Sequence, residues 1–286
     1  MKPPQSSARV LDQFYTRPEV ADRCTAFAID WVRKQGWPRV AWMEPSAGTG
    51  AFFERLPEPR CGMDVDPRCA GVLTGDYLTW DPSGWMHRNH HHMVIGNPPF
   101  GRNASLALKF FNRSADWADA IAFIVPRTFE KESLQRRLHR GWHLSASLDI
   151  PPDSFVHDDR PRRVPVVFQI WERRDHPRPI PDAAPPPVSD FSFVRTARDA
   201  DFCIQRVGAA AGKATVWTTE TRKAPASHYF LRATGPQPSA IVARLNGIDW
   251  TPWRSRTAGN PSLTRAEVAR AYLQSLSPPT TGSDPT

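Results

Sequence analysis

The segment from Met93 to Phe100, MVIGNPPF, holds the side chains best suited to chemistry. Its apolar start predicts a short buried strand, and Pro98 and Pro99 must end it, because proline lacks a backbone N–H and has a fixed φ. The chain therefore leaves the sheet at Asn97. The Asn97 side-chain oxygen and the Pro98 carbonyl can each accept one hydrogen of an exocyclic NH2 group, while Phe100 stacks on the flat ring that carries it. An ordinary turn at a strand exit is the alternative that these residues leave open.

A glycine-rich turn lies upstream of this segment. Val40–Met43 reads as a buried strand, and Glu44–Gly50, EPSAGTG, as a turn that opens a helix near Ala51. Such a turn lets a ligand approach the backbone closely at the carboxyl edge of a parallel sheet. It lacks the GxGxxG spacing and the lysine of a P-loop, which disfavours a dinucleotide or a nucleoside triphosphate. Glu44 would repel phosphate and attract a positive centre, such as an ammonium or a sulfonium.

Two acidic residues follow the next predicted strands. Asp64 ends the strand that starts at Arg60, about 15 to 20 residues after the glycine turn, where an α/β nucleotide fold places the carboxylate that binds ribose hydroxyls. An exposed acidic turn before Pro67 is the alternative. Asp76 lies in a third short strand region, where it could accept from an adenine amino group while Tyr77 covers the ring.

The histidines and cysteines do not predict a metal site. His87, His90, His91 and His92 lie in one loop, and adjacent histidines in a loop seldom converge on an ion. The four cysteines at positions 24, 61, 69 and 203 form no CxxC pair. We expect reduced thiols and a cytoplasmic location, since the N-terminus shows no apolar leader region. No apolar run reaches the roughly 18 residues of a membrane span, so a membrane partner is not expected.

The composition favours a polyanionic partner. Among 286 residues, 37 Lys and Arg outnumber 29 Asp and Glu, which gives a net charge of +8. The excess leans toward the C-terminal half, and nucleic acid is the most plausible partner for such a charge. A hydrophobic content of 40% is sufficient for a large core. Charge alone does not identify nucleic acid, because many basic proteins bind none.

Strands and helices alternate through the first part of the chain, which predicts an α/β domain. A helix should begin after Thr16, with Glu19 at capping-box spacing, and end near Gly36. Asn103 should cap another helix, and Thr128 should open one more. Further strands are predicted at 120–125, 144–150 and 164–171. Phe155, in the charged loop between the last two, would either press on a bound base or anchor the loop in the core.

The C-terminal part is predicted to be a separate, smaller domain. Residues 175–190 are rich in proline and read as a linker. Residues 191–274 show short strands at 191–195, 202–207, 214–218 and 228–231, followed by a helix that Thr264 and Glu267 cap. Residues 275–286 are predicted to be a disordered tail.

Basic and aromatic residues interleave in this second domain, and they are candidate contacts to phosphates and bases. A solvated basic surface is the alternative for each of them. The candidates are Arg206, Lys213, Arg222, Lys223, Arg232, Arg254 and Arg256, with Trp217, Tyr229 and Trp253.

Taken together, EPSAGTGAF, GMDVDP, GDYL and IGNPPF, in this order, resemble the S-adenosylmethionine (SAM)-dependent amino-methyltransferases, most closely the adenine-N6 DNA methyltransferases. The resemblance implies a Rossmann-like class I methyltransferase domain at 1–174, with a seven-stranded, mostly parallel sheet whose last strand is antiparallel. It implies a β-rich target-recognition domain at 191–274, with double-stranded DNA as partner and SAM as cofactor. A restriction nuclease encoded separately would fit such an enzyme.

The resemblance also implies a role for each matching residue. Phe14, Tyr15 and Thr16 resemble the segment at the methionine end of SAM, although Arg17 stands where a proline is more usual. Glu44, Ser46, Ala47, Gly48 and Gly50 resemble the glycine-turn motif. Asp64 and Val65 correspond to the ribose site, Asp76 and Tyr77 to the adenine site, and Asn97, Pro98, Pro99 and Phe100 to the catalytic motif, with Asn97 also near the cofactor.

The implied reaction is a direct in-line methyl transfer to the N6 of a flipped adenine. No cysteine is placed as a nucleophile, which disfavours methylation of cytosine C5. Structured RNA and a protein glutamine remain alternative substrates, because the motif suits any planar NH2 group. A catalytically silent SAM- or DNA-binding module is the alternative from a different class. The oligomeric state and the recognition sequence are not predicted.

Overall fold

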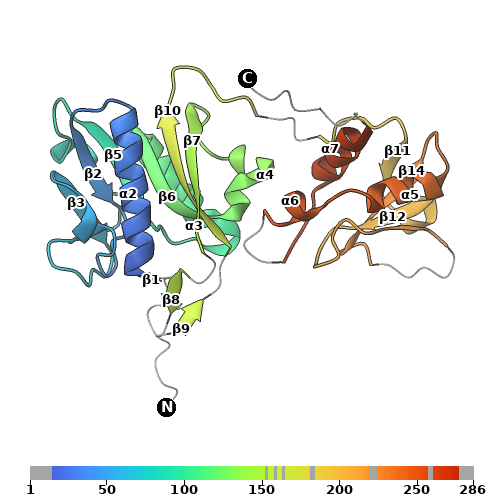
Figure 1. Cartoon of the computed structure of the whole chain (residues 1–286), viewed down its shortest axis with the longest axis horizontal. Helices are drawn as coiled ribbons and strands as arrows, with labels where there is room; N and C mark the ends of the chain where they lie inside the picture. Colours follow the sequence, from blue (N-terminus) through green and yellow to red (C-terminus); the bar gives the residue numbers. More distant parts are fainter. Residues whose placement is uncertain are drawn as a thin grey trace, which may run out of the picture. The chain divides into compact units, whose positions relative to one another are not determined.

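The computed structural model describes residues 15–151, 154–157, 160–162, 165–180, 184–218, 224–256 and 260–276. The chain divides into two compact units, Met1–Ile180 and Pro181–Thr286 (Figure 1). Each is described by itself.

Unit 1 is built on a seven-stranded sheet, with helices on its faces (Figure 1). Its strands are β2 (Val40–Glu44), β3 (Arg60–Asp64), β4 (Leu73–Thr74), β5 (His91–Gly96), β6 (Ala120–Pro126), β7 (Trp142–Asp149) and β10 (Val166–Arg173). They are arranged in the order β4-β3-β2-β5-β6-β10-β7. The five strands from β4 to β6 pair in parallel, whereas β10 is antiparallel to both β6 and β7. The predicted fold class, with an antiparallel last strand, is confirmed.

Both faces of this sheet are covered, which explains the continuous apolar runs of the central strands. Every residue of β6 is buried. Helix α2 (Pro18–Lys34) packs on β10 through Phe27 and Phe168, whose ring centroids lie 6.3 Å apart. Helix α3 (Ser105–Ala115) packs on the same strand through Phe111 and Trp171, 5.4 Å apart. Phe168 and Trp171 are three residues apart in a strand, so the two helices cover opposite faces.

Several predicted helix starts were wrong. Arg17, not Thr16, is the N-cap of α2 and makes no side-chain cap bond. Only a 3₁₀ turn, η1 (Phe53–Arg55), follows the glycine turn in place of the helix expected near Ala51. Asn103 lies in the 3₁₀ turn η3 (Arg102–Ala104) with a left-handed φ of 55° and does not cap α3. The region from Thr128 forms only η4 (Arg127–Glu130) and the short α4 (Glu132–Gln135). One more 3₁₀ turn, η2, spans Pro82–Gly84.

A small sheet forms where a loop was expected. The strands β1 (Tyr15–Thr16), β8 (Phe155–His157) and β9 (Arg160–Arg162) pair antiparallel in the order β1-β8-β9. Thr16 pairs with Phe155 here, which explains why it does not cap α2.

The end of unit 1 includes the first residues of the predicted linker. Arg178 is buried, and its guanidinium donates to the Trp142 carbonyl at 2.9 Å and to the Gln135 carbonyl at 3.1 Å. Its backbone N–H donates to the Arg140 carbonyl at 2.7 Å. Proline-rich composition alone therefore does not show where the packing of unit 1 ends.

Unit 2 has a four-stranded antiparallel sheet in the order β11-β14-β12-β13. Its elements are β11 (Phe191–Val194), η5 (Ala197–Asp199), β12 (Phe202–Gln205), β13 (Ala214–Val216), β14 (His228–Ala233), α5 (Pro238–Asn246), α6 (Thr251–Arg254) and α7 (Arg265–Leu276). Phe202 and Leu231 of the sheet share a core with Leu245 of α5 and Val268 of α7.

The capping box predicted for the last helix is confirmed. The Thr264 N–H donates to Glu267 Oε2 at 2.7 Å, and the Glu267 N–H donates to Thr264 Oγ1 at 3.2 Å. Of the predicted tail, residues 277–286 lie outside the described residues. No helix in the described part of the chain is long and apolar enough to cross a membrane.

Candidate active site

The neighbouring strands β2 and β5 mark the point where the strand order of the sheet reverses. From β2 the chain continues outward to β3 and β4, and from β5 it continues in the other direction to β6. In open α/β sheets, ligands bind at the carboxyl ends of the strands at such a switch point. Glu44 ends β2, Asp64 ends β3 and Asn97 follows β5. The topology therefore brings three predicted site residues to one edge of the sheet.

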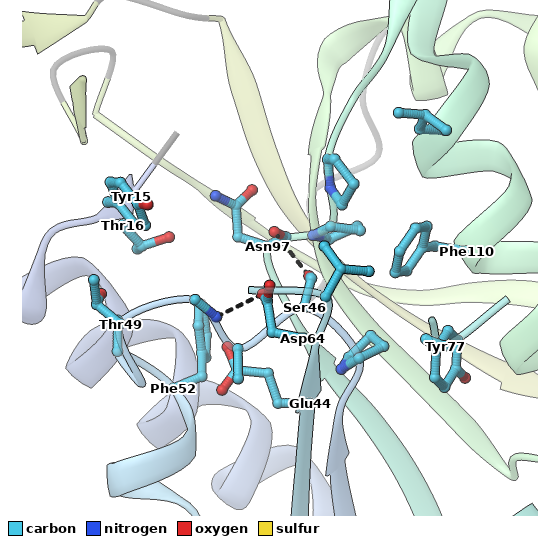
Figure 2. Close-up of a pocket in the computed structure, with 18 of the residues that line it drawn as sticks. Tyr15, Thr16, Glu44, Ser46, Thr49, Phe52, Asp64, Tyr77, Asn97 and Phe110 are labelled. Atoms are coloured by element: carbon cyan, nitrogen blue, oxygen red, sulfur yellow. Dashed lines mark hydrogen bonds between the residues drawn. The ribbon is translucent and has the colours of Figure 1, made fainter. Parts of the chain in front are cut away.

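A cavity of about 310 Å³ opens at this edge (Figure 2). It is lined by predicted site residues from every motif of the sequence, so segments far apart in the chain share one cavity. Those residues are Tyr15, Thr16, Glu44, Ser46, Ala47, Gly48, Asp64, Val65, Asp76, Tyr77, Asn97, Pro98, Pro99 and Phe100.

Asp64 is fixed by the backbone of the loops around it. Its Oδ2 accepts from the Gly48 N–H at 2.8 Å, and its Oδ1 accepts from the Asp66 N–H at 2.9 Å. A carboxylate has about four acceptor positions, so both oxygens retain capacity for ligand hydroxyls. Asp64 is 6% exposed, and it therefore presents a rigid, oriented acceptor pair to the cavity.

Glu44 is a buried acid in the cavity wall. Its side chain is 2% exposed, and its Oε2 atom has no hydrogen-bond partner among the described residues. Burial raises the pKa of Glu44 well above its usual range, the Phe53 N–H opposes that rise, and the charge of Asp64 adds to it. A cationic ligand group beside Glu44 would favour its charged form and so offset the effect of burial.

Gly50 shapes the glycine turn without lining the cavity. Its φ is +84°, and a Cβ at this position would lie 2.4 Å from Cys69 Sγ. Glycine is therefore required both by the backbone conformation and by the space available. Its N–H donates to the Ala47 carbonyl at 2.7 Å, which closes the turn.

The Asn97 loop is tied directly to the glycine turn. Ser46 Oγ donates to the Asn97 carbonyl at 3.2 Å, a contact drawn in Figure 2. Downstream, the Leu106 N–H donates to the Phe100 carbonyl at 3.0 Å, which anchors the other end of the loop. Asn97 lines the same cavity as Gly48. The loop is therefore held against the turn at one end and against α3 at the other.

Tyr77 lines the cavity but is almost completely buried. It is 1% exposed, its hydroxyl bonds to Ser114 Oγ at 2.8 Å, and its ring stacks on Phe110 at 5.6 Å. Burial raises its pKa. Asp76 is exposed, and its Oδ1 accepts from the Leu78 N–H at 3.0 Å. Tyr77 thus gives the cavity an apolar ring, while Asp76 lies at its rim.

Strand β1 brings the N-terminal segment to the cavity. A Cβ at Gly48 would lie 3.4 Å from Tyr15 Cε1, so the Tyr15 ring lies against the glycine turn. The Arg68 guanidinium lies 5.6 Å from the centroid of that ring. Phe14 lies outside the described residues.

Phe155 matches the core-anchor alternative rather than an open base contact. It is fully buried, and its ring meets Phe100 edge to face at 6.2 Å. It does not line the cavity. Phe155 therefore packs against the predicted Asn97–Phe100 motif from the core side.

Eight cavity residues were missed in the sequence: Pro45, Thr49, Ala51, Phe52, Gly75, Leu78, Leu106 and Phe110. Phe52 follows the glycine turn, while Leu106 and Phe110 lie on α3 and face the cavity together because they are four residues apart. In the sequence they are indistinguishable from the core face of a helix, and only the i, i+4 spacing just after Phe100 could have indicated them.

The predicted nucleic-acid contacts lie mostly in unit 2. The Arg254 guanidinium donates to the Ala209 carbonyl at 2.8 Å, and Arg256 lies over Trp253 at 5.5 Å. Arg206 lies over Tyr229 at 4.9 Å, and Lys213 is exposed. Arg222 and Lys223 lie outside the described residues. Among the described residues, no group of three or more His, Cys, Asp and Glu is placed to hold a metal ion.

Comparisons with known proteins give fold-level likenesses. No protein-family model matches the chain, and no curated protein matches it. Among solved structures, a Pyrococcus horikoshii protein provisionally described as an RNA methyltransferase is 18% identical, with a TM-score of 0.42, and the match covers 61% of this chain and 92% of that one.

A branched-chain polyamine synthase from Thermus thermophilus is 15% identical, with a TM-score of 0.42 and coverage of 61% and 62%. A SAM-dependent methyltransferase from Clostridium acetobutylicum is 10% identical, with a TM-score of 0.27 and coverage of 77% and 93%. These identities and TM-scores are too low to assign a function to this chain.

Proposed function

We propose that this protein is a SAM-dependent methyltransferase that modifies the exocyclic N6 of adenine in DNA. One observation supports this most directly: Asn97-Pro98-Pro99-Phe100 lines the same cavity as the glycine turn and Asp64, at the switch point of the sheet. A strand-exit turn without chemistry would not need to share a cavity with these residues.

The residues present fit SAM in charge and in shape. The buried Glu44 carboxyl, with no described partner for Oε2, suits a ligand with a positive centre. The Asp64 oxygens suit the two hydroxyls of a ribose. Phe52, Leu106 and Phe110 supply apolar surface for a flat base. The glycine turn is closed by its own hydrogen bond, and the Tyr15 ring lies against it where a phosphate site would have a basic group. Such a turn does not suit a phosphate chain.

The chain's own residues would position and polarise the amino group. When bound, SAM supplies a methyl group on a sulfonium, the electrophile of the reaction. The Asn97 amide oxygen and the Pro98 carbonyl accept the two amino hydrogens, which raises electron density on N6. Phe100, supported by Phe155, holds the plane of the ring. Since Ser46 fixes the Asn97 carbonyl to the glycine turn, acceptor and cofactor site keep a constant separation.

Adenine in a duplex can reach such a cavity only if it leaves the base stack. The net charge of +8 favours attraction to a polyanion. We propose DNA as the substrate. The following experiment distinguishes it from RNA and from a protein glutamine.

The test supplies SAM with a labelled methyl group to the full chain, together with duplex DNA, structured RNA or a glutamine-containing protein in parallel. We expect label in DNA, and N6-methyladenine after digestion to nucleosides. Label only in RNA or protein would overturn the DNA assignment. No label in any substrate, together with no binding of SAM by calorimetry, would overturn the methyltransferase assignment as well.

A further inference from the structure

Two arginines in unit 2 converge on one tyrosine. The guanidinium carbon of Arg206 lies 4.9 Å from the centroid of the Tyr229 ring, and that of Arg265 lies 5.4 Å from it. Arg265 also lies 5.5 Å from the Phe193 ring, which meets Tyr229 edge to face at 5.7 Å. We call Arg206, Arg265, Tyr229 and Phe193 the arginine–tyrosine cluster.

The backbone holds this cluster in place. The Arg206 N–H donates to the Ser227 carbonyl at 2.9 Å, and the Arg206 carbonyl accepts from the Leu263 N–H at 2.8 Å. The Tyr229 hydroxyl donates to the Leu263 carbonyl at 3.2 Å. Arg265 is the first residue of α7 and directly follows Thr264 of the capping box. The two guanidiniums therefore extend from fixed points and lose little freedom on binding a ligand.

Among the described residues, no carboxylate lies within ion-pair distance of Arg206 or Arg265, although the charge of Glu267 acts on Tyr229. The buried Arg206 Nε has no hydrogen-bond partner there either. Glu267, close in sequence, is buried and bonded to Thr264. Asp201 accepts from the Ala233 N–H instead.

Two cations beside one ring repel each other, and the cation–π contacts to the ring offset this only in part. A phosphate removes the repulsion, because guanidiniums bind phosphate oxygens through paired N–H donors. The Tyr229 ring is already contacted by two guanidiniums and one phenyl ring. It serves to hold the arginines and leaves little open surface on which a base could stack.

We propose that the arginine–tyrosine cluster binds the phosphate backbone of duplex DNA. The inference rests on the proposed function for its choice of DNA, and it deepens that function by separating two tasks. Phosphate contacts fix position and affinity without reading sequence, so the bases of a recognition site must be read by other residues. Arg265 and Phe193 are new members of the predicted DNA-binding set, and Tyr229 changes from a base contact to a support for phosphate contacts.

The test measures binding of a random-sequence DNA duplex to the full chain by fluorescence anisotropy, between about 50 and about 200 mM salt. The variants are Arg206→Gln, Arg265→Gln and the double variant. The slope of log affinity against log salt is negative. Each lost phosphate contact should make it less steep by about 1, and the double variant should make it less steep by about 2. Affinity at low salt should fall about tenfold for each single variant.

Arg244→Gln is the matched control. Arg244 is an exposed arginine on α5 of the same unit, and its guanidinium donates to the Ser275 carbonyl at 2.8 Å. The variant removes the same charge, so a slope close to that of the unchanged chain is expected. Tyr229→Ala, which removes the ring that both arginines contact, should weaken binding. Thermal unfolding of each variant identifies any loss of folding.

Unchanged slopes in folded Arg206→Gln and Arg265→Gln would overturn the inference, as would an equal loss in Arg244→Gln. Binding of duplex RNA but not of duplex DNA would overturn it too. Since methyl transfer is not measured, this failure is distinguishable from failure of the proposed function. A chain that shows the expected slopes but methylates nothing would retain the DNA-binding cluster and lose the proposed activity.

Discussion

The backbone N–H of Gly48 donates to Asp64 Oδ2 at 2.8 Å, and so the acid at the end of β3 holds the glycine turn that follows β2. The other oxygen accepts from the Asp66 N–H, also within the loops at this edge. The predicted ribose acid is therefore also a structural part of the turn. Loss of this carboxylate should affect folding and ligand binding together.

Asp64→Ala should destabilise the fold and weaken SAM binding. It leaves two backbone N–H groups without their acceptor, which costs about 1–3 kcal/mol for each group that stays buried. Affinity for SAM should fall at least about tenfold, because two hydroxyl acceptors are lost as well. Urea denaturation and calorimetry measure the two effects. Asp66→Ala is the control, since Asp66 is half exposed and pairs only with Arg68 at the surface. Equal effects in both variants would contradict the role given to Asp64.

Glu44 predicts a pH dependence of stability with a definite sign. Burial raises its pKa in the folded state, so between the usual glutamate range and that raised value the folded state keeps a proton that the unfolded state has lost. The free energy of unfolding must therefore fall as pH rises through this window. The contribution is fully present below the usual glutamate pKa.

In Glu44→Gln, residue 44 cannot titrate. Between a pH below this window and a pH above it, the free energy of unfolding of this variant should therefore fall less than that of the unchanged chain. Urea denaturation at a series of pH values gives the comparison. Glu54→Gln, an exposed carboxyl in the adjacent turn, is the control and should follow the unchanged chain. Parallel curves for Glu44→Gln and the unchanged chain would show that Glu44 is not buried as a neutral acid.

Gly50→Ala should disrupt the glycine turn. The left-handed φ of +84° costs an alanine about 1–2 kcal/mol, and the clash of its Cβ with Cys69 Sγ adds about 1–3 kcal/mol. Thermal unfolding should show the loss, and SAM binding should fall with it. Adding Cys69→Ala should restore only part of the stability, since the φ strain remains. Gly84→Ala, which has no atom within 4 Å of its added Cβ, should be nearly neutral. An unperturbed Gly50→Ala would argue against this turn geometry.

Asn97→Ala should abolish methyl transfer while SAM binding persists. The change removes the amide acceptor for the target amino group, and loss of one such electrostatic contact typically lowers kcat by about 100-fold to 1,000-fold. Single-turnover transfer and calorimetry separate the two properties. Asn97→Asp keeps an acceptor oxygen and should retain part of the rate. Undiminished turnover in Asn97→Ala would remove the central assignment.

The strands of the two larger sheets and one capping box were predicted well because their signals are local. The run Ala120–Val125 is apolar throughout, and a strand buried on both faces needs such a run. Thr264 and Glu267 cap α7 through bonds that span only three residues. No distant part of the chain can easily override either signal.

Other helix starts failed because a distant partner competed for the same groups. Thr16 has the spacing of a capping box with Glu19, but β8 pairs with it as a strand. The helix expected near Ala51 ends after the 3₁₀ turn η1. There the N–H of Phe53 donates to Glu44, the last residue of the preceding strand. Local propensity is a weak prior wherever tertiary hydrogen bonds are available.

The sequence by itself predicted most of the residues that line the cavity and the kind of sheet that presents them, since proline, glycine and apolar runs act within a few residues of backbone. Only the tertiary structure decided that Phe52, Leu106 and Phe110 complete the cavity and that Phe155 supports Phe100 from the core. It also decided that Arg206 and Arg265 both lie over the Tyr229 ring. These relationships join residues far apart in the chain, and their distances exist only once the sheets and helices have packed.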